Sequence, residues 1–448
     1  SIAGITEDRR IQLLLIAFAF GAFFEGAAGF GTPVAVTAAI LIGLGFSPLA
    51  ASGLSLIANT APVAFGALGT PVITLAKVHG YDLMEVTAMV GRQLPFFSVL
   101  VPFWLIWAFA GRKAMMEIWP IILVTGVSFA IPQYLVSNFI GPELVDIIAA
   151  IVSMVCTVGF LRIWQPRTIW RSTSLKGHES SGGEAQAPRA VTQHPRADVI
   201  RAWTPWAILT VFVFIWGLPS VKAALNGLFA PAFPMEGLHN MVEKVPPVVR
   251  QPTKEGAIYT LNLLSATGTG ILLSAIVGGL VMKYNPVQLV SQFVRTLWLV
   301  RYSLITIVLM LALGTLTRYS GTDTTLGLAF ANTGVFYPFF GTLMGWLGVA
   351  LTGSDTASNV LFGGMQKVAA EQLGLSPNLM GAANSSGGVM GKMIDAQSIV
   401  VASTATRWFN HEGDILRYVF FHSVALACLM GIFVTLQAYV WPFRLMVN

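Results

Sequence analysis

Long runs of apolar residues, separated by short polar stretches, make up most of the sequence, and residues 11–24 and 208–215 are typical of them. A helix needs about 20 residues to cross the hydrocarbon core of a bilayer, so the chain has room for about ten to twelve crossings. The runs lack the strict alternation of apolar and polar residues that the strands of a membrane barrel show. The pattern therefore predicts an all-α polytopic membrane protein.

Two segments interrupt this pattern. Residues 24–76 and 351–406 are rich in Gly, Pro, Ser, Thr and Asn. Non-helical backbone at membrane depth is tolerated only where protein or water covers it, so a continuous lipid-facing helix is not expected in either segment. We predict broken or re-entrant helices in both.

The two irregular segments also resemble each other. The matched parts, which share residue types and follow in the same order, are Gly26 with Gly353, 45–48 with 374–377, and 58–66 with 383–391. Three matches in one order predict an internal structural repeat. The alternative, two unrelated Gly-rich membrane segments, stays open.

Charged residues in the loops predict the orientation of the chain. The polar stretch 163–201 has seven Lys and Arg against three acidic residues between Arg162 and Arg201. By the positive-inside bias this loop is cytoplasmic, and its composition is typical of disorder. The second polar stretch, 231–255, has three basic and three acidic residues and is predicted to be external. The loop 163–201 thus separates a first membrane half, 1–162, from a second, 202–448, which contains the external loop.

The same charges predict that the two repeats are inverted. After the first segment the chain runs from an acidic loop at Asp82 toward Lys113, hence from outside to inside. After the second it runs from a basic loop at Arg417 toward Trp441, in the opposite direction. Inverted repeats with interrupted helices are typical of secondary transporters, whose binding site lies at the breaks.

A further acidic pair, Glu143 and Asp146, follows a predicted span at 119–139. Arg112 and Lys113 lie before this span, and the next span leads to the basic loop, so the alternation of sides makes the pair part of an external loop.

Composition supports a membrane location. Hydrophobic residues make up 55% of the 448 residues, charged residues only 10%, and the mean hydropathy is +0.72, whereas charged residues are about 25% of a soluble domain. The net charge of +6 reports topology rather than affinity for nucleic acid. The two cysteines, Cys156 and Cys428, are too few for a disulfide framework or a zinc site, and we predict no bound metal.

Ionisable groups at membrane depth cost about 2.5 to 3.5 kcal/mol each on insertion, so each one is a functional hypothesis. Glu25, Asp355, Lys392 and Asp395 qualify because all four lie in the irregular segments. Two structural alternatives remain open: Lys392 and Asp395 as a buried ion pair, and Glu25 as a capping carboxylate.

Helix breaks also suit a small carboxylate ligand, since the N-terminus of a half-helix presents free N–H groups and a positive dipole. The polar residues at the breaks are therefore candidate ligand-binding residues, and they are Asn59, Thr60, Ser354, Asn384, Ser385, Ser386, Lys392 and Gln397.

Other motifs are absent or uninformative. Residues 387–393 are similar to a P-loop, but the glycine spacing is one residue short and Met393 occupies the position of the magnesium-binding Ser or Thr. No ATPase, enzyme or cofactor site is predicted. Gly341 and Gly345 have the spacing of a helix-packing face.

Several longer sequence blocks resemble the L-lactate permease family, the bacterial lactate and glycolate permeases. The blocks that carry the resemblance are GAFFEGAAGFG at 21–31, NTAPVAFG at 59–66, GRQLPF at 91–96, SNFIGPEL at 137–144, LTGSDT at 351–356, GGVMGKMI at 387–394 and QSI at 397–399. The resemblance implies a proton-coupled importer of lactate, glycolate and related 2-hydroxymonocarboxylates in the bacterial inner membrane. It also implies hairpin-bearing inverted repeats that form a mobile transport domain, and further membrane segments upstream of Ser1.

With this resemblance we expect a secondary active transporter that imports L-lactate, or a related 2-hydroxymonocarboxylate such as glycolate or D-lactate, with a proton. Lys392 would add positive charge beside the substrate carboxylate, and Gln397 or a neighbouring Asn or Ser would hold the 2-hydroxyl. Asp355, Glu25 and Asp395 are the candidates for proton coupling. The alternative is a small-anion channel without proton coupling. The expected partners are the small carboxylate, the proton and membrane lipid, with no nucleic acid.

Overall fold

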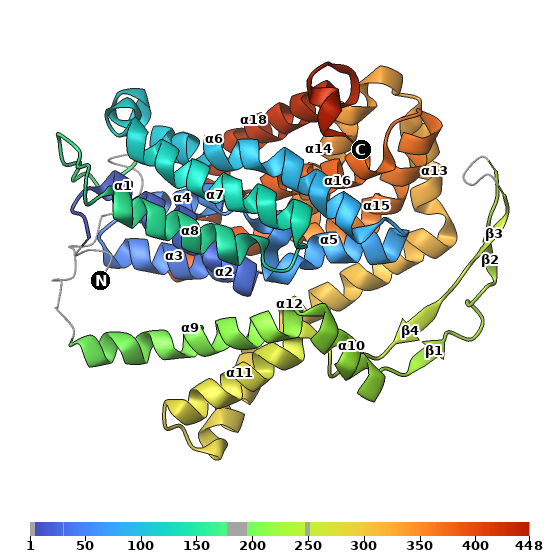
Figure 1. Cartoon of the computed structure of the whole chain (residues 1–448), viewed down its shortest axis with the longest axis horizontal. Helices are drawn as coiled ribbons and strands as arrows, with labels where there is room; N and C mark the ends of the chain where they lie inside the picture. The colour runs from blue at the N-terminus through green and yellow to red at the C-terminus, as the bar shows by residue number, and fades with distance from the viewer. Residues whose placement is uncertain (1–4, 30, 177–194, 247–250, 448) are drawn as a thin grey trace. The chain divides into compact units, whose positions relative to one another are not determined.

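The computed structural model describes residues 5–29, 31–176, 195–246 and 251–447 and is mostly helical (Figure 1). The chain forms two compact units, one of residues Ser1–Val191 with Thr325–Asn448 and one of residues Thr192–Thr324. Disorder is predicted for the basic loop 163–201, and its residues 177–194 lie outside the described residues.

The first unit contains both irregular segments. Its elements are α1 (Arg9–Leu13), the π-helix η2 (Leu14–Phe20), α2 (Gly21–Ala27), α3 (Thr32–Gly43), α4 (Pro48–Ala58), the 3₁₀ helix η3 (Val63–Phe65), α5 (Gly66–His79), α6 (Leu83–Glu117), α7 (Trp119–Phe139), α8 (Val145–Phe160), η4 (Gly334–Phe336), α14 (Tyr337–Thr352), α15 (Asp355–Gln372), α16 (Pro377–Gly391), α17 (Ala396–Ala405), α18 (Glu412–Tyr439) and η5 (Phe443–Met446).

The second unit corrects the prediction of a purely α-helical chain. Residues in and around the predicted external loop pair as two short antiparallel ribbons, and the next helix begins at Thr267. Its elements are α9 (Arg196–Gly217), α10 (Pro219–Leu228), β1 (Ala232–Pro234) paired with β4 (Ile258–Thr260), β2 (Val242–Lys244) paired with β3 (Thr253–Glu255), α11 (Thr267–Val281) and α12 (Pro286–Ser320), and α13 (Thr322–Ala331) crosses the junction.

Several helices are long and apolar enough to cross a membrane. Among the described residues there are five, and a sixth if α4 and the helix after it, bent by 66°, are counted as one span. The predicted span at 119–139 is confirmed as α7. Exposed apolar side chains such as Phe96, Ile131 and Phe421 suit contact with lipid. The count of ten to twelve crossings stays a prediction.

The predicted interruptions in both irregular segments are confirmed. Residues 59–62 separate α4 from η3, and residues 392–395 separate α16 from α17. Within α5 three consecutive residues, Ala67, Leu68 and Gly69, have left-handed backbone, and Gly353 ends α14 in the same conformation. Most residues at the breaks are buried within the unit. Non-helical backbone in a bilayer requires such cover, because lipid cannot satisfy its hydrogen-bonding groups.

The two segments share local structure at one of the predicted matches. Gly45 and Gly374 are both left-handed, with φ of 91° and 67°. Each is followed by a Ser-Pro helix start, where Ser47 Oγ accepts from Ala50 N at 3.4 Å and Ser376 Oγ accepts from Leu379 N at 3.3 Å. These are equivalent N-caps. The match of Gly26 with Gly353 is wrong as a structural equivalence, because Gly26 lies inside α2. Inversion of the repeat stays a prediction.

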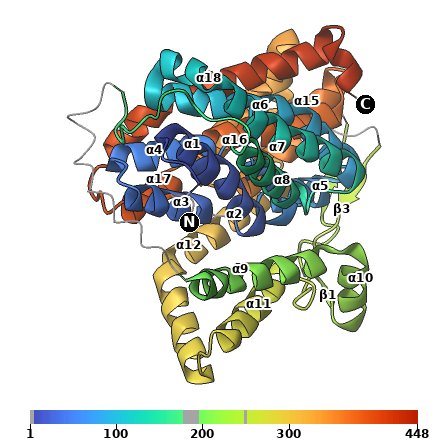
Figure 2. The same cartoon turned by 60° about the vertical axis from the view of Figure 1, so that its left-hand side comes forward.

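Helix α16 lies at the centre of this unit and contacts α6, α14, α15 and α18, while α17 contacts both α3 and α4 (Figure 2). Glycines bring α14 and α16 close together. A Cβ atom on Gly345 would lie 2.1 Å from the Asn384 carbonyl oxygen, and one on Gly387 would lie 2.2 Å from the Thr342 carbonyl oxygen. The helix-packing role predicted for Gly345 is confirmed, since small residues permit such contact in membranes.

Substitution Gly345→Val is expected to force these helices apart and to lower the free energy of unfolding by about 1 to 3 kcal/mol or more. Thermal unfolding of the purified protein in detergent measures this loss. Gly159→Ala on α8 is the matched control, because no neighbouring atom lies within 4 Å of the added Cβ. Equal melting temperatures for the two variants would contradict the packing argument.

Candidate functional site

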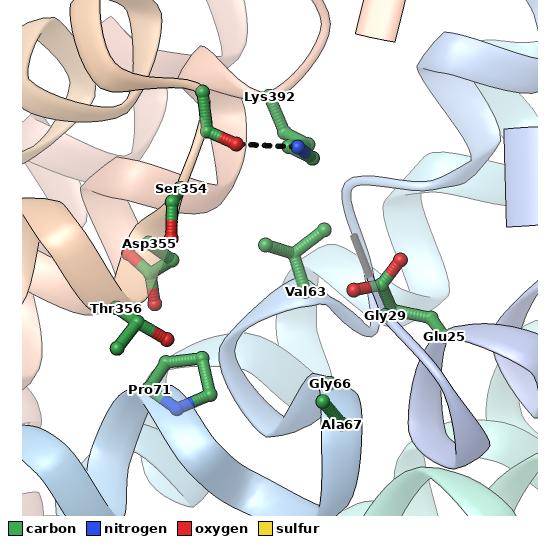
Figure 3. Close-up of a pocket in the computed structure, with 11 residues that line it drawn as sticks. Glu25, Gly29, Val63, Gly66, Ala67, Pro71, Ser354, Asp355, Thr356 and Lys392 are labelled. Carbon is green, nitrogen blue, oxygen red and sulfur yellow. Dashed lines mark hydrogen bonds between the residues drawn. The ribbon is translucent and has the colours of Figure 1, made fainter. Parts of the chain in front are cut away.

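A small cavity lies where the two irregular segments meet (Figure 3). Its volume is about 30 Å³, which leaves room for only a few water molecules. The cavity brings together three of the charged residues predicted from sequence, Glu25, Asp355 and Lys392. Its lining residues are Glu25, Gly29, Val63, Gly66, Ala67, Pro71, Gly353, Ser354, Asp355, Thr356 and Lys392.

The N-terminus of α15 forms one wall of the cavity. Left-handed Gly353 ends α14, and Ser354 caps α15 by accepting from Ala357 N at 3.3 Å. Residues of the first turn therefore line the cavity with backbone N–H groups that have no partner within the helix. Together with the dipole of an 18-residue helix, this wall favours an anion.

Asp355 places a carboxylate in that same turn. Its Oδ2 accepts from Ser385 Oγ at 2.5 Å and from Asn359 Nδ2 at 3.4 Å. Its Oδ1 has no hydrogen-bond partner among the described residues and lies against α16, where a Cβ atom on Gly388 would be 2.3 Å away. The carboxylate is therefore buried and only partly satisfied.

Lys392 links the two breaks of the second segment. Its Nζ donates to the Gly353 carbonyl oxygen at 2.6 Å, as Figure 3 shows, and lies 3.2 Å from Asp395 Oδ2. Asp395 in turn caps α17, accepting from Ser398 N at 2.7 Å. The ion pair that the sequence left open is thus present, although Lys392 also lines the cavity.

Glu25 approaches from the opposite wall, in the last turn of α2. Its side chain is buried, and its Oε2 has no hydrogen-bond partner within the described part of the chain. The carboxylate lies directly against Gly66, where a Cβ atom would be 2.4 Å from Oε1. The Asn59 side chain, at the end of α4, lies near it. Glu25 is therefore a cavity carboxylate rather than a helix cap.

A chain of buried polar side chains leads away from Asp355. Tyr337 donates to Gln366 at 2.7 Å, and Gln366 donates to Asn384 at 3.2 Å. Asn384 donates to Asn359 Oδ1 at 2.9 Å, and Asn359 Nδ2 lies 3.2 Å from Ser385 Oγ. The sequence did not single out Tyr337, Asn359 or Gln366. Asn359 and Gln366 are seven residues apart and so lie on one face of α15. This spacing of two polar residues could have predicted a polar helix face.

Several predicted ligand-binding residues do not line the cavity in this conformation. Asn384 and Ser385 belong to the polar chain behind Asp355, Thr60 Oγ1 donates to the Ile57 carbonyl at 2.8 Å, and Gln397 lies beside Gly353. Ser386 is buried with no hydrogen-bond partner for its Oγ in the described residues. Of the predicted set, Ser354 and Lys392 line the cavity.

Comparison with known proteins gives a consistent set of relatives. Residues 1–441 match the family described as L-lactate permease. The chain is similar to the glycolate permease GlcA of Escherichia coli strain K12, with 47% identity over 98% of the chain and 80% of that protein. It is also similar to the L-lactate permeases of Salmonella typhimurium, with 46% identity over 98% of the chain and 80% of that protein, and of Bacillus subtilis, with 44% identity over 99% and 81%.

Among solved structures, the YdaH transporter of Alcanivorax borkumensis overlaps with the chain at a TM-score of 0.35 and 13% identity, over 95% of the chain and 84% of that transporter. The family and the relatives are named as permeases, in agreement with the prediction of a transporter rather than an enzyme.

Removal of the Lys392 ammonium tests the electrostatic design of the site. Lys392→Met leaves Asp395 as a buried charge without its cation, and a broken buried pair costs about 3 to 5 kcal/mol. We expect a marked fall in melting temperature, partly recovered in the double variant Lys392→Met/Asp395→Asn because the pair is coupled. Lys113→Met, at an exposed lysine of α6, serves as the control. Additive effects of the two site substitutions would contradict the pairing.

Proposed function

The chain belongs to the L-lactate permease family, and from that premise we propose that it is a secondary active transporter that imports a 2-hydroxymonocarboxylate together with a proton. The observation that carries the proposal is the cavity in which Glu25, Asp355 and Lys392 meet between two interrupted segments. Interrupted helices that meet at a charged site are the usual architecture of such transporters.

Relatives named as L-lactate permease and glycolate permease support the substrate class. Lactate and glycolate both combine a carboxylate with a neighbouring hydroxyl and differ by one methyl group. A methyl group in an apolar pocket changes affinity by only about 1 to 3 kcal/mol, so L-lactate, D-lactate and glycolate all remain within the proposed class.

The substrate carboxylate is proposed to bind at the N-terminus of α15, with Ser354 and Lys392 as partners. Since the cavity holds about 30 Å³, it must widen before a lactate anion enters, as alternating access requires. In the widened site, Asn59, Thr60, Asn384, Ser385 and Ser386 supply amides and hydroxyls to the carboxylate. Gln397, beside Gly353, is proposed to hold the 2-hydroxyl.

Charge balance in the cavity supports coupling to a proton. Two carboxylates and one ammonium line it, so a substrate anion adds negative charge where negative charge is already in excess. A proton on Asp355 or Glu25 removes that repulsion, and by linkage the substrate then strengthens proton binding to the same degree. Asp395 is proposed to position Lys392, given its ion pair and its cap of α17.

The proposed setting is the bacterial inner membrane, with the loop 163–201 in the cytoplasm and the two irregular segments as inverted repeats. The excess of Lys and Arg in that loop and the acidic loop at Asp82 support this orientation.

Asp355→Asn tests the role of Asp355 in coupling. The variant cannot exchange a proton at this position, so we expect it to lose lactate accumulation driven by a pH gradient in proteoliposomes while it keeps exchange of lactate for lactate. Asp414→Asn, at an exposed aspartate of α18, is the matched control and is expected to accumulate lactate normally. Full accumulation by Asp355→Asn would remove this residue from the coupling mechanism.

Transport kinetics distinguish the transporter from the alternative, a small-anion channel. Lactate uptake by the wild-type protein is expected to saturate and to acidify the vesicle interior in step with lactate entry. Both are followed in one experiment with labelled lactate and an internal pH dye. Uptake that rises without saturation and without proton entry would favour a channel.

A further inference from the structure

One buried carboxylate is left unexplained by the cavity and by the charge pattern of the loops. The interpretation of Asp146 as a loop residue is wrong. Asp146 lies in the first turn of α8 and is 1% exposed. Neither of its carboxylate oxygens has a hydrogen-bond partner among the described residues, and no basic side chain there pairs with it.

Asp146 packs against α2. Helices α2 and α8 pack closely at Gly26, where a Cβ atom would lie 2.7 Å from the Asp146 Cβ and 3.1 Å from the Ile147 N atom. The residue before Gly26 is Glu25, which lines the cavity. Helices η2, α2, α5 and α7 pack against α8, and α2 brings Glu25 near enough to Asp146 for the two carboxyl groups to interact.

An ionised carboxylate in this position would be a buried charge with neither a cation nor a hydrogen-bond donor, which costs several kcal/mol. A neutral carboxylic acid avoids most of that cost. The proximity of Glu25 acts in the same direction, because two neighbouring carboxylates resist simultaneous ionisation. Burial and the lack of partners together therefore favour one or more protons held by this pair of acids.

We propose that Asp146 is a proton-binding residue of the transport cycle, and that it forms with Glu25 an acid pair that carries the coupled proton between the α7–α8 loop and the cavity. In the transfer step the Asp146 O–H bond breaks and an O–H bond forms on the Glu25 carboxylate. Asp146 is left as a carboxylate and takes up the next proton from water at the loop, where Glu143 is partly exposed. The inference rests on the proposed function, since it assigns a path to the proton of that symport.

The test uses wild-type protein and Asp146→Asn in proteoliposomes. Asn imitates the neutral acid in size and cannot release a proton. A positioned proton-transfer group contributes about a hundredfold or more to a rate, so we expect accumulation of L-lactate driven by a pH gradient to fall at least about tenfold. Counterflow of labelled against unlabelled lactate is expected to continue and to lose its dependence on pH. Asp146→Glu, which restores a titratable group, is expected to recover part of the accumulation.

Asp414→Asn, at an exposed aspartate of α18, is the matched control and should accumulate lactate as the wild type does. A purely structural role for Asp146 predicts that accumulation and counterflow fall together and that the pH dependence of counterflow is unchanged. That result, or accumulation at the wild-type level, would overturn the inference. Should Asp146→Asn not reach the membrane, Asp146→Ser provides a smaller neutral side chain with the same two outcomes.

The wild-type measurement separates this inference from the proposed function. If wild-type vesicles accumulate lactate or glycolate under a pH gradient and Asp146→Asn vesicles do the same, Asp146 has no part in coupling and the transporter stands. If wild-type vesicles accumulate neither substrate, the proposed function fails and the inference fails with it.

Discussion

Backbone groups at an interrupted helix must find partners inside the protein, because the bilayer core offers none. In this chain the requirement is met by a few side chains at the breaks of the second segment. Lys392 donates to the carbonyl oxygen of Gly353, Ser354 caps α15, and Asp395 caps α17 while it pairs with Lys392. The groups that close the breaks are also groups that carry charge into the membrane. The same residues therefore satisfy the backbone at the breaks and form the polar site.

Glycine determines how close these charges come to one another and to the helices around them. Asp355 lies against Gly388, the Glu25 carboxylate lies against Gly66, and Asp146 lies against Gly26. A Cβ atom at any of the three glycines would come within 2.7 Å of the acidic side chain, so each acid occupies space that a larger residue would fill. The glycine-rich composition of the irregular segments thus has a specific use, which is to leave room for carboxylates between closely packed helices.

The sequence predicted best those features that depend on local composition. Hydropathy alone places α7, because its length and apolar character are those of one crossing, and the Gly and Pro content locates the interruptions near Asn59 and Lys392. The sequence predicted a binding site at the helix breaks, but it did not predict that Glu25 and Asp355 line the same cavity. The order of residues does not show which parts of the two segments come together.

The sequence did not predict features that depend on the direction in which a side chain points. Asn384 and Ser385 are predicted ligand-binding residues, but helix α16 places them in hydrogen bonds with Asn359 and Asp355, and neither lines the cavity in this conformation. Asp146 follows a loop in sequence, but α8 begins one residue earlier and directs it inward against α2. The short ribbons of the second unit were missed because each strand has only three residues, too few to set an alternating pattern.

The left-handed residues of α5 give the cavity wall an elastic character. Left-handed backbone costs roughly 1 to 2 kcal/mol for a residue with a side chain, and Ala67 and Leu68 both adopt it, with φ of 43° and 59°. The neighbouring Gly69 lies against Pro142 of the α7–α8 loop, where a Cβ atom would be 2.6 Å away, so the tight turn is held in place from outside. Relaxation of this turn toward ordinary helix would release energy where Ala67 borders the cavity. The cavity wall at Ala67 is therefore strained backbone, and a change of the site that relaxes this turn is favoured by the loss of that strain.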